Sequence, residues 1–147
     1  MAQHVQKHIA LYAPALSPVL FFILAHVLTL LTLVLMKTGV VQSDQGVCKT
    51  VVTWAVYGFI PFLLCSYGSF FLAARPAAVA LERKRPDWSV TRQHLATGAV
   101  YGAVLIAALF LLLGPDSWIG RLLLFFIGAA AGQGNWLFYC KIAGNDA

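Results

Sequence analysis

The chain has 147 residues, of which 61% are hydrophobic and only 10% are charged. Soluble domains average about 45–50% apolar and about 25% charged residues, so this composition excludes an ordinary soluble domain and indicates a protein of the lipid bilayer. A net charge of +5 could indicate nucleic-acid binding, but half of the ten Lys and Arg residues lie in one stretch between apolar runs. We therefore interpret the basic residues as topology signals and headgroup contacts, and we expect no nucleic-acid partner.

Residues 1–16 precede the first long apolar run and carry Val5, Ile9 and Tyr12 at helical spacing. Polar residues occupy the other faces of this segment. A short helix with one apolar and one polar face is suited to the membrane surface. The pattern predicts an interfacial helix before the first membrane span.

Four apolar runs are long enough to cross a membrane, because about 20 helical residues span the hydrocarbon core and satisfy their own backbone hydrogen bonds. The spans are expected at about residues 18–36, 51–74, 95–113 and 118–140. Ser17 and Pro18 are typical of a helix start, since Ser caps free amides and Pro has no amide hydrogen to leave unpaired. Pro61 is expected to kink the second span.

The stretch 75–94 is basic and divides the chain into two apolar halves. Arg75 and Pro76 open a short helix in this stretch, and Pro86 must end it, because proline disfavours the helical conformation of the residue before it. Each apolar half contains two spans. The sequence therefore predicts two membrane hairpins joined by a basic hinge.

Short polar residues mark the ends of the third and fourth spans. Asp87 or Ser89 is expected to cap the third helix, and Asp116 the fourth. Gly114 and Pro115 predict a tight turn between the two helices. Because this turn is short, we expect the two spans to be antiparallel neighbours.

Orientation follows from the distribution of Lys and Arg, since positively charged flanks resist translocation. With both termini in the cytoplasm, the cytoplasmic residues are Lys7, Arg75, Arg83, Lys84, Arg85, Arg92 and Lys141, and the outer ones are Lys37, Lys49 and Arg121. This excess predicts an all-α integral membrane protein of one domain, with two antiparallel hairpins and both termini inside. Short loops and compactness favour a bacterial inner membrane.

Glycine pairs mark the third and fourth spans. Gly98 and Gly102 lie four residues apart in one span, and Gly128 and Gly132 do so in the other. Glycine every fourth residue makes a flat groove that allows two helix backbones to approach closely. The pattern predicts helix packing, either within the chain or against a second copy or another membrane protein.

Three residues inside the predicted spans are candidates for a polar intramembrane site: His26, Gln133 and Asn135. Polar groups are costly in lipid unless paired, so the two amides either hydrogen-bond between helices or contact a substrate or ion. His26 is either a neutral, hydrogen-bonded residue or one that shuttles protons or ligates haem or a metal. No second His, Asp or Glu lies in any predicted span, so we expect no metal and no cofactor.

Basic residues of the hinge form either a solvated face or a docking surface for anionic lipid or a partner protein. These residues are Arg75, Arg83, Lys84, Arg85 and Arg92. The sequence contains no paired carboxylates, nucleophile–base pair or phosphate-binding glycine loop typical of an enzyme.

The favoured hypothesis is therefore a non-enzymatic accessory, assembly or immunity-type subunit, which binds another membrane protein through its glycine faces and basic hinge. Two alternatives stay open. The first is an oligomeric transporter or channel for a small solute, ion or lipid-linked substrate. The second is a haem- or quinone-associated subunit.

Overall fold

The computed structural model describes residues 9–39 and 45–144; of the side chains in 45–55, it describes Thr53 alone. This part of the chain is entirely helical in its regular structure and contains no strand. Four of its helices are long and apolar enough to cross a membrane. The expected all-helical class and the four candidate membrane spans are thus confirmed, and the chain is a membrane protein.

The first long helix, α2, covers Leu16–Lys37 and follows the short 3-10 turn η1, Ala13–Ala15. The prediction that Ser17 caps this helix is wrong, because the N-cap position is held by Ala15 and no side chain caps the first turn from within the segment. Ser17 lies inside the first turn and bonds to another helix. The first half of the predicted interfacial helix, residues 1–8, lies outside the described residues, and the second half leads through η1 into α2.

Three helical segments follow one another without a break: α3, Gln45–Ser69; the π-helical turn η2, Phe70–Ala74; and α4, Arg75–Lys84. The wide turn closes with a hydrogen bond from the Arg75 N–H to the Phe70 carbonyl. It precedes Pro76, which cannot donate a helical hydrogen bond, so the wider turn lets the helix continue toward the proline. The short hinge helix is confirmed, and it is a direct extension of the second span.

The last two helices are α5, Val90–Leu113, and α6, Trp118–Ala143. Ser89 caps α5 by accepting a hydrogen bond from the Arg92 N–H, as one of the two predicted caps. Gly114 ends α5 in the left-handed conformation, with φ of 34°. The predicted cap of α6 is wrong by one residue, because Ser117 and not Asp116 accepts from the first turn.

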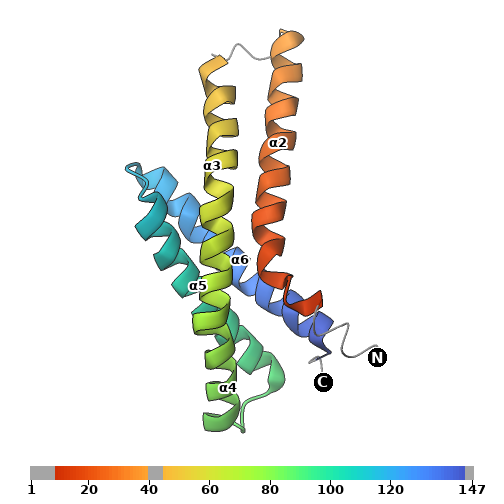
Figure 1. The fold of residues 1–147 in the computed structure, drawn as a ribbon, viewed down its shortest axis with the longest axis vertical. Coiled ribbons are helices and arrows are strands. Elements are labelled where there is room, and N and C mark those ends of the chain that lie inside the picture. The colour runs from red at the N-terminus through yellow and green to blue at the C-terminus, as the bar shows by residue number, and fades with distance from the viewer. Residues whose placement is uncertain (1–8, 40–44, 145–147) are drawn as a thin grey trace.

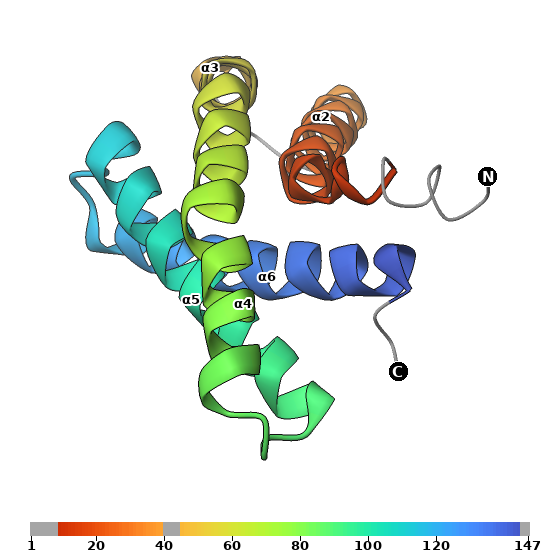
Figure 2. The same ribbon diagram turned by 60° about the horizontal axis from the view of Figure 1, so that its bottom comes forward.

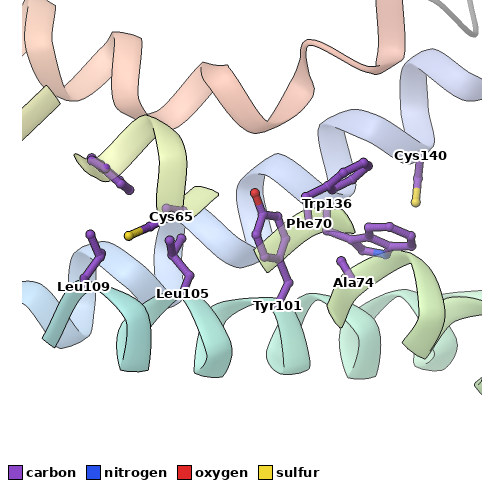
Figure 3. Close-up of a cluster of buried hydrophobic side chains, with 10 residues drawn as sticks. Cys65, Phe70, Ala74, Tyr101, Leu105, Leu109, Trp136 and Cys140 are labelled. Carbon is purple, nitrogen blue, oxygen red and sulfur yellow. The ribbon is translucent and has the colours of Figure 1, made fainter. Parts of the chain in front are cut away.

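The helices form two pairs that cross obliquely (Figures 1 and 2). In one pair, α2 and α3 lie side by side, with the Phe22 and Phe59 rings 5.1 Å apart. In the other, α5 and α6 are in close contact along their glycines. The buried core lies where the pairs cross and is built around Phe70, Tyr101, Leu105 and Trp136 (Figure 3). Only 6% of the α2 span is buried, against 28% to 33% of the other three.

Candidate functional site

The four glycines of the paired motifs all lie at the contact between α5 and α6. A Cβ atom on Gly132 would collide with the backbone of Gly102, and one on Gly102 would lie 3.4 Å from the Ala129 Cα. Added Cβ atoms on Gly128 and Gly98 would meet the side chains of the facing helix. This surface is therefore occupied within the chain and is not open to a partner.

Asn135 lies at the centre of a polar cluster and is completely buried. Its Oδ1 atom accepts hydrogen bonds from the backbone N–H of Ser17 at 3.2 Å and from the Ser17 hydroxyl at 2.6 Å. The first backbone N–H groups of a helix have no partner within that helix. Asn135 of α6 thus caps the start of α2 from a distant part of the chain.

The Asn135 Nδ2 atom faces three acceptors: the Pro14 carbonyl at 3.3 Å, the Ser66 hydroxyl at 3.2 Å and the Tyr101 hydroxyl at 3.4 Å. An amide carries two N–H donors, so two of these bonds form at any moment. Each of the three acceptors belongs to a different element, respectively η1, α3 and α5. A single side chain therefore connects the four long helical units of the fold.

Ser66 and Tyr101 complete the cluster. The Ser66 hydroxyl donates to the Pro14 carbonyl at 2.6 Å, and the Tyr101 hydroxyl lies 2.8 Å from the Ser66 hydroxyl and donates to the Ser66 carbonyl at 3.0 Å. Both residues are fully buried. Figure 3 shows the Tyr101 hydroxyl directed away from α5, toward the other helices. We call these five residues, Pro14, Ser17, Ser66, Tyr101 and Asn135, the polar node.

Every donor of the polar node has an acceptor within the node. Ser17 donates twice to Asn135, and Ser66 and Tyr101 each have one hydroxyl hydrogen and an acceptor for it. A fully satisfied buried network specifies how helices pack, whereas a reactive or binding group needs a free donor or acceptor. The geometry of the node is that of an interhelical joint.

His26 does not join the polar node. Its Nδ1 lies 2.8 Å from the Phe22 carbonyl in the same helix, and its ring centroid is 4.2 Å from the Phe22 ring. A carbonyl only accepts, so Nδ1 carries a hydrogen and donates it to Phe22. His26 is nine residues beyond Ser17, about 13 Å along the helix axis, so the two polar regions of α2 are separate.

Gln133 lies two residues before Asn135 but on another face of α6. Its side chain covers Gly98, and its Nε2 atom is buried without a hydrogen-bond partner among the described residues. The sequence placed Gln133 and Asn135 in one candidate polar site. The structure separates them, because residues two apart on a helix do not face the same side.

The basic hinge residues are divided between two elements. Arg75, Arg83 and Lys84 line an open groove of about 630 Å³ along α4, together with Phe71, Pro76, Val79 and Ala80. We call this hollow the α4 groove. Arg85 lies just past α4 with its guanidinium 5.7 Å from the Trp88 ring, and Arg92 is exposed in the first turn of α5.

Sequence reasoning missed the roles of Ser17, Ser66 and Tyr101 in the polar node. Their hydroxyls were visible as polar groups within or beside apolar runs, and such groups need partners in lipid. Which partners they find depends on the crossing of two helix pairs, which no local spacing reveals. Comparison of the chain with protein-family models, with curated proteins and with solved structures finds no match.

Proposed function

We propose that this chain is a non-enzymatic subunit that binds another membrane protein, in an accessory, assembly or immunity-type role. The proposed docking surface is the α4 groove. The observation that carries this proposal is the direction of α4, which continues the line of α3 past the apolar part of the span (Figure 1).

The length of this continuous helix supports a position of its basic end at the outer edge of the lipid headgroups or beyond it. From Gln45 to Lys84 it extends about 60 Å, twice the roughly 30 Å of a hydrocarbon core. Arg83 and Lys84 follow Arg75 by eight and nine residues, or about 12–14 Å, whereas one headgroup layer is about 5–8 Å thick. A helix lying flat would place its cations on anionic lipid, but a helix in line with the span presents them to a protein.

The lining of the α4 groove defines the partner chemistry. The groove combines three cationic side chains with four apolar ones and contains no acidic residue. Such a surface complements a partner segment with carboxylates beside apolar side chains. We infer that the partner docks an acidic, partly apolar segment next to the membrane.

Membrane orientation is part of the proposal. The excess of Lys and Arg on one side supports a cytoplasmic location for α4 and for both termini, with α2–α3 and α5–α6 as the two hairpins. A bacterial inner membrane is the proposed location. The glycine faces do not serve as docking surfaces in this version, because they pack α5 against α6.

The transporter alternative has less support. In that hypothesis Gln133, Asn135, His26 and the kink at Pro61 line a polar path. However, Asn135 is fully hydrogen-bonded and His26 bonds within its own helix. A metal site at His26 would need further ligands, and the described residues contain no group of three or more His, Cys, Asp or Glu side chains.

Gentle extraction of the full chain from native membranes, followed by mass analysis of the intact complex, tests the docking proposal. We expect a stoichiometric second protein whose recovery falls about tenfold in the double variant Arg83→Gln, Lys84→Gln. The variant removes two cations from the docking surface, and a loss of about 1.4 kcal/mol in binding free energy corresponds to a tenfold weaker complex. Lys37→Gln, at the far end of α2, is the matched control and should leave recovery unchanged. Isolation of the chain alone or only with copies of itself would overturn the proposal, as would undiminished recovery with the double variant.

A further inference from the structure

A second hollow lies on the inner side of α4, between this helix, the start of α5 and the end of α6. It has a volume of about 460 Å³, within the usual range for small-ligand sites, and we call it the α4–α6 cleft. Its polar lining consists of Arg75, Glu82, Gln93, His94, Thr97, Trp136 and Tyr139. Nothing in the proposed docking role uses the side chains of α5 and α6 in this cleft.

Opposite charges lie at two positions of its α4 wall. Arg75 and Glu82 are seven residues apart, so they share a face of the helix at a separation of about 10 Å along its axis. No ion pair of either side chain is found within the part of the chain that the structure describes, and the Arg75 guanidinium lies 5.8 Å from the centroid of the Phe71 ring. The cleft thus offers one free cation and one free anion.

Trp136 supplies an unsatisfied donor in the α6 wall. The residue is only 4% exposed, and its indole nitrogen is buried without a hydrogen-bond partner among the described residues. Buried N–H groups are almost always paired in folded proteins, so an orphan donor beside a cleft indicates a missing acceptor. In Figure 3 the indole nitrogen faces the side of Ala74, the residue just before Arg75.

Gln93 supplies an acceptor in the α5 wall. Its Nε2 atom donates to the carbonyls of Arg85 at 3.2 Å and Trp88 at 3.3 Å. These bonds use both amide hydrogens and fix the orientation of the side chain. The Oε1 atom is left to accept a hydrogen bond from a ligand.

We propose that the α4–α6 cleft binds the headgroup of an ethanolamine phospholipid. The phosphate accepts from Arg75 and from the Trp136 indole N–H, and the primary ammonium donates to Glu82 and to Gln93 Oε1. A phosphate matches a guanidinium and an N–H donor, because its oxygens are charged acceptors. A primary ammonium has three N–H donors for the two acceptors, Glu82 and Gln93 Oε1. A choline group has no N–H donor, and a glycerol group carries no positive charge to pair with Glu82.

The position of the cleft favours a lipid over a soluble ligand. Arg75 is the first charged residue after the apolar part of the α3–α4 helix, and Trp136 lies near the same end of α6. Tryptophan, tyrosine and arginine at the ends of membrane spans lie at headgroup depth. A lipid can therefore bring its phosphate to the cleft while its chains stay in the bilayer.

Native mass spectrometry of the purified full chain tests this assignment, with phosphatidylethanolamine, phosphatidylcholine and phosphatidylglycerol of identical acyl chains as probes. We expect the ethanolamine lipid to bind about tenfold more tightly than the other two, as the loss of one charged hydrogen bond implies. Equal affinity for the three lipids would overturn the proposal. Free phosphoethanolamine is the test of the lipid itself. If it displaces the bound lipid at concentrations equal to that of the lipid, the ligand of the cleft is a soluble compound and not a lipid.

Two substitutions separate the two halves of the headgroup. Glu82→Gln should abolish the preference for ethanolamine and leave phosphatidylglycerol binding unchanged, while Trp136→Phe should weaken both lipids by the same several-fold factor because both carry the phosphate. Trp118→Phe and Arg83→Gln, outside the cleft, are the controls. Glu82 is exposed, so its variant should fold even if the Trp136 variant does not. An unchanged preference in Glu82→Gln would exclude the proposed ammonium contact. Arg75 lines both hollows, so the lipid measurements use the purified chain without a partner, and Glu82 and Trp136 belong to the cleft alone.

Discussion

The α5–α6 pair and the α2 helix are both apolar enough to span a membrane, yet they are held in place by different forces. Backbone meets backbone at Gly102 and Gly132 in the α5–α6 pair. In α2 only Pro18 and Thr29 are buried, and the helix is held by ring contacts to α3 and by the bonds from Ser17 to Asn135. Lipid is as apolar as leucine, so burial of apolar surface does little to hold helices together there. Close packing holds the first region, and hydrogen bonds at one end hold the second.

Gly132→Leu should have the largest effect, because any Cβ at this position collides with the backbone of Gly102. We expect α5 and α6 to separate, with a loss of about 3 kcal/mol in the free energy of unfolding, as for strong overpacking. The measurement is unfolding in mixed micelles followed by circular dichroism. Gly134→Leu is the matched control, since nothing lies within 4 Å of a Cβ there. Equal stability of the two variants would contradict the backbone contact.

Asn135→Leu should rank second and should affect the other region. It removes the acceptor of the Ser17 N–H and hydroxyl, which are then left unpaired at the base of α2. We expect a loss of about 1–2 kcal/mol and a broader distance distribution between spin labels on α2 and α6. Labels on α5 and α6 should keep their distance. If all helices separate together, the two regions are not held independently.

Tyr101→Phe should have a smaller effect, because it removes one donor and leaves the ring in the core. Loss of the hydrogen bond to the Ser66 carbonyl should lower the free energy of unfolding by about 1 kcal/mol. Tyr57→Phe is the control, since that side chain is 76% exposed and its hydroxyl lies outside the polar node. Equal destabilisation in the same unfolding assay would argue against a contribution from the node.

Gln133→Leu should have the smallest effect and sharpens the comparison with Asn135. The Gln133 Nε2 atom is buried with no partner in the described part of the chain, so its removal relieves an unsatisfied donor and should change stability by about 0–1 kcal/mol in the favourable direction. The two amides are nearly adjacent in sequence but opposite in their expected effects. A loss as large as that of Asn135→Leu would indicate that Gln133 has a partner or a function of its own.

The ends of the helices could be predicted where they depend only on residues close in sequence. Ser89 caps α5 and Gly114 ends it as expected, because a cap and a left-handed residue act within one turn. Ser17 was expected to cap its own helix in the same way. Instead its hydroxyl bonds to Asn135, more than a hundred residues along the chain, because the base of α2 lies against α6.

The candidate site was less predictable than the helices. His26, Gln133 and Asn135 were selected because polar groups are costly in lipid, and that argument ranks them equally. The structure assigns them three environments: a bond within one helix, a buried donor without a partner, and the centre of a saturated network. Trp136 and Glu82 in the α4–α6 cleft were not selected, since an aromatic residue and a carboxylate near span ends are common.

The sequence alone determined that this is a helical membrane protein with four candidate spans, through its composition and the length of its apolar runs. Both depend on how single segments interact with lipid, for which hydropathy and helix length suffice. Only the tertiary structure decided that α3 continues into α4, that the glycine faces are occupied within the chain, and that Asn135 connects the long helices. These features depend on contacts between segments distant in sequence, and in lipid such contacts are selected by shape and hydrogen-bond partners, which the hydropathy of each segment does not encode.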